Sequence, residues 1–172
     1  MNFSAIKPAD IANGTGVRVS LFVSGCRNRC PGCFNPETWD FAHGEPFDGR
    51  TAERIIALLE PEYINGLTLL GGEPFEPENQ QALLPLVRRV REVYPDKTIW
   101  CYTGYLYDRD LVPGGRRYGE STDELLDALE VLVDGPFLQD QADISLRFRG
   151  SRNQRLIDMV STRRSGRVTL WQ

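Results

Sequence analysis

Short apolar runs typical of buried strands alternate with helical patterns along this chain, and few folds satisfy that alternation. The expected strands cover residues 17–23, 66–70, 98–103 and 131–133, and the expected helices cover residues 51–60, 78–93 and 121–129. Parallel strands joined through helices have right-handed crossovers. Four such units are too few for a closed eight-stranded barrel. The pattern therefore predicts an α/β fold with mostly parallel strands, as a partial, open barrel or a small doubly wound sheet.

The helix boundaries follow from capping residues and from proline. Thr51 is the expected cap of the first helix, and Ser121 with Glu124 forms an expected capping box. Pro85 falls inside the second helical pattern and should bend that helix or delay its start. Beyond residue 134 the patterns weaken to an alternation over 144–148, an apolar run over 156–160 and a candidate final strand over 167–171.

Distinctive turns follow three of the expected strands directly. Cys26, Gly71 and Asp134 each stand at or just beyond the carboxyl end of a strand. In open α/β sheets and in α/β barrels, ligand binding and chemistry gather at the carboxyl ends of the strands. We therefore expect these turns to meet in one site.

Three of the four cysteines are crowded into one loop with the spacing Cys26-x3-Cys30-x2-Cys33. Thiolates are soft ligands that suit zinc, copper(I) and iron–sulfur clusters. Three ligands would leave one iron of a [4Fe–4S] cluster open to a substrate, whereas structural zinc sites and electron carriers normally have four ligands. The fourth ligand of such a closed site would have to be Cys101 or the single histidine, His43. Cys101 lies in an expected strand, where a buried, unreactive thiol is the commoner outcome.

The second turn reads Gly71-Gly72-Glu73-Pro74. Glycines allow a ligand or another backbone to come close, and Glu73 is an anion suited to an ammonium group. Gly-Gly before a helix is usually only a turn, but beside the cysteine loop it predicts a site for a ligand that carries an amino acid. Arg27 and Arg29 either offset the negative charge of a thiolate-bound cluster or are ordinary exposed arginines.

Length and charge exclude several classes of protein. The 172 residues suffice for one domain, which we expect over 1–172 with a core over about 10–160, and the order of the C-terminal tail stays open. A net charge of −4 without a basic tract argues against nucleic-acid binding. No segment approaches a membrane span or a secretion signal, and crowded cysteines do not form a disulfide framework, so we expect a soluble, cytoplasmic protein.

The cysteine loop together with the Gly-Gly-Glu-Pro turn resembles the radical S-adenosylmethionine (SAM) superfamily. Asn13-Gly-Thr-Gly-Val-Arg18 and Leu21-Phe-Val-Ser-Gly-Cys26 resemble the activases of glycyl-radical enzymes. Four further segments resemble the branch that activates anaerobic ribonucleoside-triphosphate reductase, namely residues 32–39, 131–137, 148–151 and 153–155. The resemblance covers about residues 10–160. Gly32 stands where many members of the superfamily have an aromatic residue, with Phe34 after the cysteine instead, and Thr15 replaces a common proline.

This resemblance implies a partial β/α barrel of the radical SAM type and a single [4Fe–4S] cluster on Cys26, Cys30 and Cys33. It implies that the cluster and SAM carry the chemistry, with no catalytic side chain beyond them. The residues implied to contact SAM are Gly32, Cys33, Phe34, Gly71, Gly72 and Glu73. Asp134 and Gly135 are further candidates to line the pocket, with a simple strand-to-loop turn equally open for Asp134. Trp39, Arg147 and Arg149 could face the partner protein or only pack and solvate an edge.

The implied activity is that of a radical SAM oxidoreductase. It would cleave SAM reductively and generate a glycyl radical on the large subunit of the anaerobic reductase, with flavodoxin or ferredoxin as reductant. The absence of a second cysteine-rich insert disfavours activases with additional clusters. The alternatives are activation of another glycyl-radical enzyme, such as pyruvate formate-lyase, or an iron–sulfur carrier or zinc module without SAM chemistry.

Overall fold

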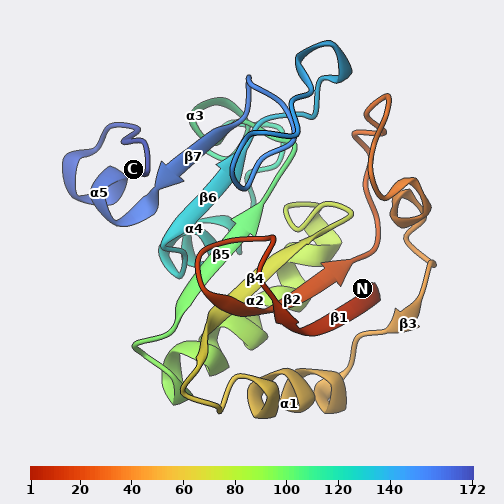
Figure 1. Cartoon of the computed structure of the whole chain (residues 1–172), viewed down its shortest axis with the longest axis vertical. Helices are drawn as coiled ribbons and strands as arrows, with labels where there is room; N and C mark the ends of the chain where they lie inside the picture. Colours follow the sequence, from red (N-terminus) through yellow and green to blue (C-terminus); the bar gives the residue numbers. More distant parts are fainter.

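The computed structural model describes residues 1–172, and seven strands form one sheet in the order β3-β1-β2-β4-β5-β6-β7 (Figure 1). The strands are β1 (Asn2–Asp10), β2 (Val17–Val23), β3 (Glu45–Pro46), β4 (Ile64–Gly71), β5 (Thr98–Tyr102), β6 (Val131–Asp134) and β7 (Arg155–Asp158). The helices are α1 (Gly49–Leu58), α2 (Pro77–Val93), α3 (Tyr107–Asp110), α4 (Thr122–Asp127) and α5 (Met159–Ser165), with short 3-10 turns at Pro36–Trp39 and Gln139–Gln141.

The sheet is mixed. The ladders β2–β4, β4–β5 and β5–β6 are parallel, whereas β1–β2, β1–β3 and β6–β7 are antiparallel. The prediction of a partial β/α barrel with mostly parallel strands is therefore wrong, because half of the pairings in this seven-stranded sheet are antiparallel and only five helices accompany it. The sequence pattern does not predict the outer strands β1, β3 and β7, because each joins the sheet by antiparallel pairing and not through a strand–helix–strand unit.

The elements that the sequence does not predict have weak local patterns. β1 combines a buried Phe3 with an exposed stretch over 7–9, so it has no continuous apolar run. β7 occupies only the first part of the apolar run 156–160, because α5 begins at Met159 with Asp158 as its cap. The candidate strand over 167–171 makes one isolated bridge, between Leu170 and Ile157, and residues 144–148 form a loop rather than a strand.

The helices also differ in detail from the expected boundaries. α1 is capped by Asp48, whose carboxylate accepts from the backbone N–H of Thr51 at 2.9 Å, so the cap lies three residues earlier than predicted. α2 continues through Pro85 over its full length. The side chain of Ser121 makes no capping hydrogen bond, so the predicted capping box before α4 is wrong.

The two faces of the central strands are covered differently. One face, called here the helix face, contributes alternate strand residues to a closed apolar core with α1, α2 and α4, and these residues include Val19, Leu21, Leu67, Leu69, Ile99, Cys101 and Leu132. The opposite face presents Arg18, Phe22, Thr68, Leu70, Trp100, Tyr102 and Val133. No helix covers this opposite face in the way that α2 covers the other, and segments before β2 and after β6 lie over it (Figure 1).

The amino end of the opposite face is closed by polar and aromatic contacts. Arg18 is completely buried and donates to Thr68 Oγ1 at 2.7 Å and to the backbone oxygen of Leu67 at 2.8 Å. Its guanidinium also lies over the ring of Trp100, which contacts Trp171 from the C-terminal tail. The open part of this face therefore lies toward the carboxyl ends of the strands.

None of the helices has the length and the apolar character that a membrane span requires.

Candidate functional site

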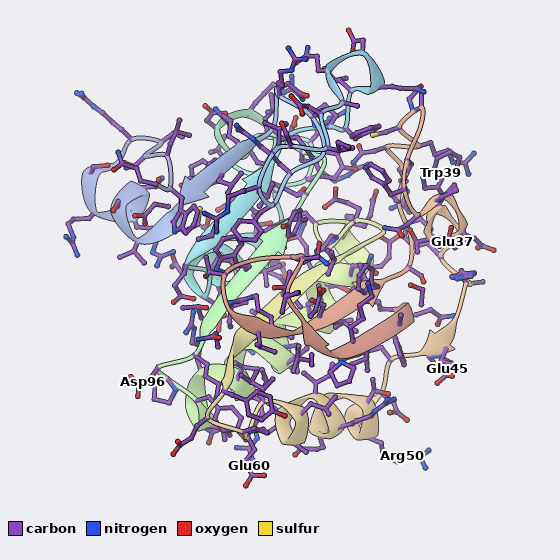
Figure 2. The ribbon with its side chains drawn as sticks, viewed as in Figure 1. Glu37, Trp39, Glu45, Arg50, Glu60 and Asp96 are labelled. Carbon is purple, nitrogen blue, oxygen red and sulfur yellow. The ribbon has the colours of Figure 1, made fainter.

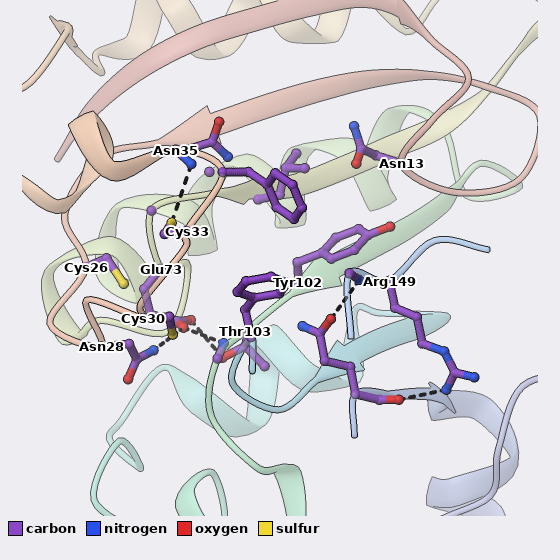
Figure 3. Close-up of a pocket in the computed structure, with 18 of the residues that line it drawn as sticks. Asn13, Cys26, Asn28, Cys30, Cys33, Asn35, Glu73, Tyr102, Thr103 and Arg149 are labelled. Atoms are coloured by element: carbon purple, nitrogen blue, oxygen red, sulfur yellow. Dashed lines mark hydrogen bonds between the residues drawn. The ribbon is translucent and has the colours of Figure 1, made fainter. Parts of the chain in front are cut away.

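A cavity of about 540 Å³ lies at the carboxyl ends of β2, β4 and β5 (Figure 3). Its floor includes Phe22, Leu70 and Tyr102 from the opposite face, and segments 135–154 form a further wall. Of the predicted site residues, the cavity is lined by Cys26, Cys30, Cys33, Phe34, Gly71, Gly72 and Glu73. The structure thus brings the cysteine loop and the Gly-Gly-Glu turn together, as their strand-end positions suggested.

The cysteine loop, defined here as residues 24–35, begins where β2 ends. Cys26 is buried, Cys30 and Cys33 are half-buried, and all are free thiols. Backbone bonds from Gly25 N to Thr38 O (2.8 Å) and from Cys26 N to Trp39 O (3.2 Å) fold the segment after the loop back against its start. Three soft donors therefore face one end of the cavity, on a loop that is otherwise half-exposed.

Burial affects the protonation of the metal-free thiols. It raises the pKa of Cys26 to about 12, and it also raises the pKa of Cys30. Metal and cluster ligands must be thiolates, so uptake of a cluster at neutral pH would release protons from these residues.

The candidate fourth ligands lie elsewhere. Cys101 is completely buried on the helix face, inside the apolar core, and His43 does not line the cavity. No three Cys, His, Asp or Glu side chains converge closely enough to hold a single metal ion. The loop therefore offers three thiols, one fewer than the four ligands of structural zinc sites and of electron-transfer clusters.

The Gly-Gly turn packs directly on the cysteine loop. Gly72 N donates to Val23 O at 2.7 Å and Glu73 N donates to Gly25 O at 2.9 Å. A Cβ on Gly72 would lie only 2.7 Å from the backbone oxygen of Gly25. Gly72 is therefore required for close approach of two backbones, the end of β4 and the chain just before Cys26.

The carboxylate of Glu73 is buried and accepts from four donors. One oxygen accepts from Phe75 N (2.9 Å) and Thr103 Oγ1 (2.8 Å), and the other accepts from Gly104 N (2.7 Å) and Asn28 Nδ2 (3.2 Å). Burial raises its pKa to about 7 despite these bonds. Figure 3 shows Asn28, Glu73 and Thr103 grouped beside Cys30, so this carboxylate links the cysteine loop to the end of β5.

Two predicted residues do not line the cavity. Asp134 is buried at the end of β6, where Arg155 Nε donates to it at 2.9 Å and Tyr107 N at 2.8 Å. Its neighbour Gly135 lines the cavity in its place. Gly32 has a φ of +74°, which favours glycine, and it lies against Gln139 rather than in the cavity wall.

Two apolar side chains that line the cavity, Phe34 and Ile144, are strongly exposed and are called here the apolar mouth. The ring of Phe34 is 73% exposed and packs at a tilt against Phe137, with 5.2 Å between the ring centroids, and Ile144 is fully exposed. Arg149 lines the cavity and donates to Gln154 O at 2.7 Å, whereas Arg147 is exposed and lies over Phe148.

Trp39 also lines the cavity, on the outer segment that follows the cysteine loop (Figure 2). Its indole nitrogen is buried without a partner. Figure 2 places it with Glu37 on this outer segment, far from Glu60 and Asp96 at the amino ends of the strands.

Several lining residues were not identified from the sequence. They include Asn28, Tyr102, Thr103, Gly104 and Phe137. The strand-end position of Tyr102–Gly104 is a usable signal, since β5 is one of the predicted strands and ends there. The contribution of segment 137–154 has no comparable local pattern.

Comparison with known proteins identifies relatives over nearly the whole chain. Residues 12–157 match the family model described as a 4Fe-4S single cluster domain, which supports an iron–sulfur cluster. The anaerobic ribonucleoside-triphosphate reductase-activating protein of Haemophilus influenzae is 44% identical over 156 residues, covering 90% of this chain and 96% of the relative. The proteins of the same name are 42% identical in Escherichia coli K12, over 90% of this chain and 96% of the relative, and 38% identical in phage T4, over 91% and 93%.

Proposed function

Because the chain belongs to the family of anaerobic ribonucleoside-triphosphate reductase-activating proteins, we propose that it activates this reductase. Activation would consist of reductive cleavage of SAM and formation of a glycyl radical on the large subunit of the reductase. The observation that supports this most directly is the presence of three free thiols at one end of a cavity that also contains the Gly71–Glu73 turn.

Cys26, Cys30 and Cys33 would hold a single [4Fe–4S] cluster and leave one iron without a protein ligand. When bound, the cluster and SAM supply the electron transfer and the carbon radical that removes a hydrogen atom from glycine. The protein's own part is to fix the three thiols, exclude water through the apolar floor and orient the ligand. Phe22 and Leu70 provide apolar surface on that floor.

The SAM side of the cavity would be formed by Cys33, Phe34 and the Gly71–Glu73 turn. Glu73 can receive an ammonium group if the bond from Asn28, its longest at 3.2 Å, is exchanged for the ligand. Gly32 and Asp134 lie outside the cavity lining, so their part would be to shape the turns that carry Cys33 and Gly135.

The reductase would approach over the apolar mouth formed by Phe34 and Ile144. Exposed apolar side chains beside a cavity are characteristic of surfaces that receive a macromolecule. We also propose flavodoxin or ferredoxin as reductant and a cytoplasmic location, since four free cysteines suit a reducing compartment.

The test is anaerobic reconstitution with iron and sulfide, followed by incubation with SAM, reductant and either anaerobic ribonucleotide reductase or pyruvate formate-lyase. We expect a glycyl doublet by electron paramagnetic resonance in the reductase. A doublet only in the lyase would mean that the partner is pyruvate formate-lyase, and the proposed SAM chemistry would stand. If the resonance signal of the reduced cluster does not change when SAM is added, the result would instead favour the alternative of an iron–sulfur electron carrier.

A further inference from the structure

Glu76 is a completely buried carboxylate directly behind the cysteine loop, and the activity proposed above assigns it no part. Its Oε1 accepts from the backbone N–H of Arg27 at 2.8 Å, and its Oε2 accepts from the Arg27 guanidinium at 2.5 Å. Arg27 is the residue immediately after Cys26. We propose that Glu76 is a positioning residue, which fixes the first turn of the cysteine loop and thereby the place of the Cys26 thiol in the cluster site.

The side chain of Arg27 is held from two further directions. Its guanidinium donates to Glu78 on α2 at 2.6 Å and lies 4.4 Å from the centre of the Phe41 ring. The loop is therefore attached to the first turn of α2 by both its backbone and a side chain. Since Glu76 and Glu78 take up the charge of Arg27, this arginine does not offer a free cation to the cluster, whereas Arg29 has no carboxylate partner.

Glu76 is itself supported from the segment that follows β5. The hydroxyl of Tyr105 donates to Oε1 at 3.0 Å, and Arg117 Nε lies 3.5 Å from Oε2. Arg117 also donates to the Tyr105 hydroxyl at 2.7 Å and covers its ring. The segment bearing Arg117 turns sharply at Gly115, where a Cβ would lie 2.5 Å from the backbone oxygen of Asp110.

All of the groups around Glu76 are donors, which explains why a carboxylate occupies this position. A glutamine of the same shape would direct its NH₂ group at donors, the Arg27 guanidinium on one side or the Arg27 backbone N–H and the Tyr105 hydroxyl on the other, and at least one bond would be lost. A buried donor left without an acceptor is not compensated for the water that it has lost. The first turn of the loop would then be less tightly fixed, although the fold would keep its apolar core.

The inference rests on the proposed function, because it assumes that Cys26 holds a cluster. The experiment compares reconstituted wild type, Glu76→Gln, Arg27→Gln and Arg88→Gln. The last variant removes the exposed ion pair between Arg88 on α2 and Glu124 on α4, away from the cysteine loop, and is the matched control. The measurements are the rate of iron release to a chelator, the spectrum of the reduced cluster with and without SAM, and the melting temperature of the metal-free proteins.

Loss of a group that orients a metal ligand typically changes metal affinity about 10–100-fold, so we expect Glu76→Gln to release iron at least about tenfold faster than wild type. We also expect a different spectral response to SAM. Arg27→Gln should show a smaller change in the same direction, since the backbone bond remains, and Arg88→Gln should match wild type. Arg27→Gln alters a half-exposed side chain, so it provides the test even where Glu76→Gln does not fold.

The inference is overturned where Glu76→Gln and Arg27→Gln match Arg88→Gln in iron release and spectrum. It is equally overturned where only the melting temperature of the metal-free protein falls, because that is the signature of a structural role alone. Wild type that binds no four-iron cluster would instead refute the proposed function.

Discussion

Leu69 and Cys101 are completely buried in the core under the helices, whereas their sequence neighbours Leu70 and Tyr102 face the cavity. The same strands therefore supply a closed interior on the helix face and a ligand-sized space on the opposite face. A shift of one residue along a strand moves a side chain from one environment to the other. Substitutions at neighbouring positions can thus separate stability from binding.

The largest difference is expected between cysteines. Replacement of Cys26, Cys30 or Cys33 by Ala should abolish the cluster, because each removes one of three proposed ligands. Cys101→Ala should keep the cluster and lower the free energy of unfolding by about 1–2 kcal/mol, through loss of a small buried side chain. Iron content and visible absorbance after reconstitution, with urea unfolding of the metal-free proteins, measure both effects. If Cys101→Ala also loses the cluster, the alternative of an electron carrier with four cysteine ligands would be favoured.

The leucine pair tests the same comparison without touching a ligand. Leu69→Ala leaves a closed void in the core and should reduce the free energy of unfolding by about 2–5 kcal/mol. Leu70→Ala opens onto the cavity, so only the transfer of apolar surface is lost, about 1–2 kcal/mol. The affinity of the reconstituted proteins for SAM should fall more in Leu70→Ala than in Leu69→Ala, because only Leu70 faces the cavity. Equal losses of stability would show that the two faces are packed alike.

The sequence predicted the strands that end at the cavity, because continuous apolar runs stopped by Cys26 or Gly71 are local signals. It also predicted that the cysteine loop and the Gly-Gly turn meet. It did not predict β1, which has no continuous apolar run, or the antiparallel pairing of β7, which depends on contacts with the earlier strand β6. The bond partners of Glu73 and Asp134 likewise come from Thr103 and Arg155, far along the chain. Local pattern therefore located the site, and tertiary packing determined which side chains line it.

Glu73 lies where the two faces meet, and its buried carboxyl should make stability depend on pH. Its pKa is raised from 4.5 to about 7 by burial, so the folded protein holds a proton that the unfolded chain has lost across that window. The contribution of Glu73 to stability therefore falls as the pH rises from about 4.5 to about 7, and the full cost of the ionised group is present above about 7. Glu73→Gln cannot titrate.

We therefore expect metal-free wild type to lose stability relative to Glu73→Gln as the pH rises from about 4.5 to about 7, and to lose no more above that. Urea unfolding of both proteins at these pH values measures the difference, and other titrating groups cancel in the comparison. A constant difference in free energy would mean that Glu73 is ionised throughout. SAM cleavage by the reconstituted variant under dithionite then tests the proposed amine contact separately, and normal cleavage would refute that contact.

The smallest effect on stability is expected at the mouth of the cavity. Phe34 is mostly exposed, and its replacement by Ala removes contacts with Phe137 and Gly150 at the surface, so the free energy of unfolding should change by about 0.5 kcal/mol. Glycyl-radical formation on the reductase should nevertheless decrease, because an apolar contact at the proposed docking surface is removed. Ile11→Ala offers a matched control, since Ile11 is equally exposed but does not line the cavity. Titration of each variant with reductase, scored by the glycyl doublet, measures the effect. If Phe34→Ala requires no more reductase than Ile11→Ala for the same doublet, Phe34 does not belong to the docking surface. Ile144 would then be the remaining exposed apolar residue of that surface.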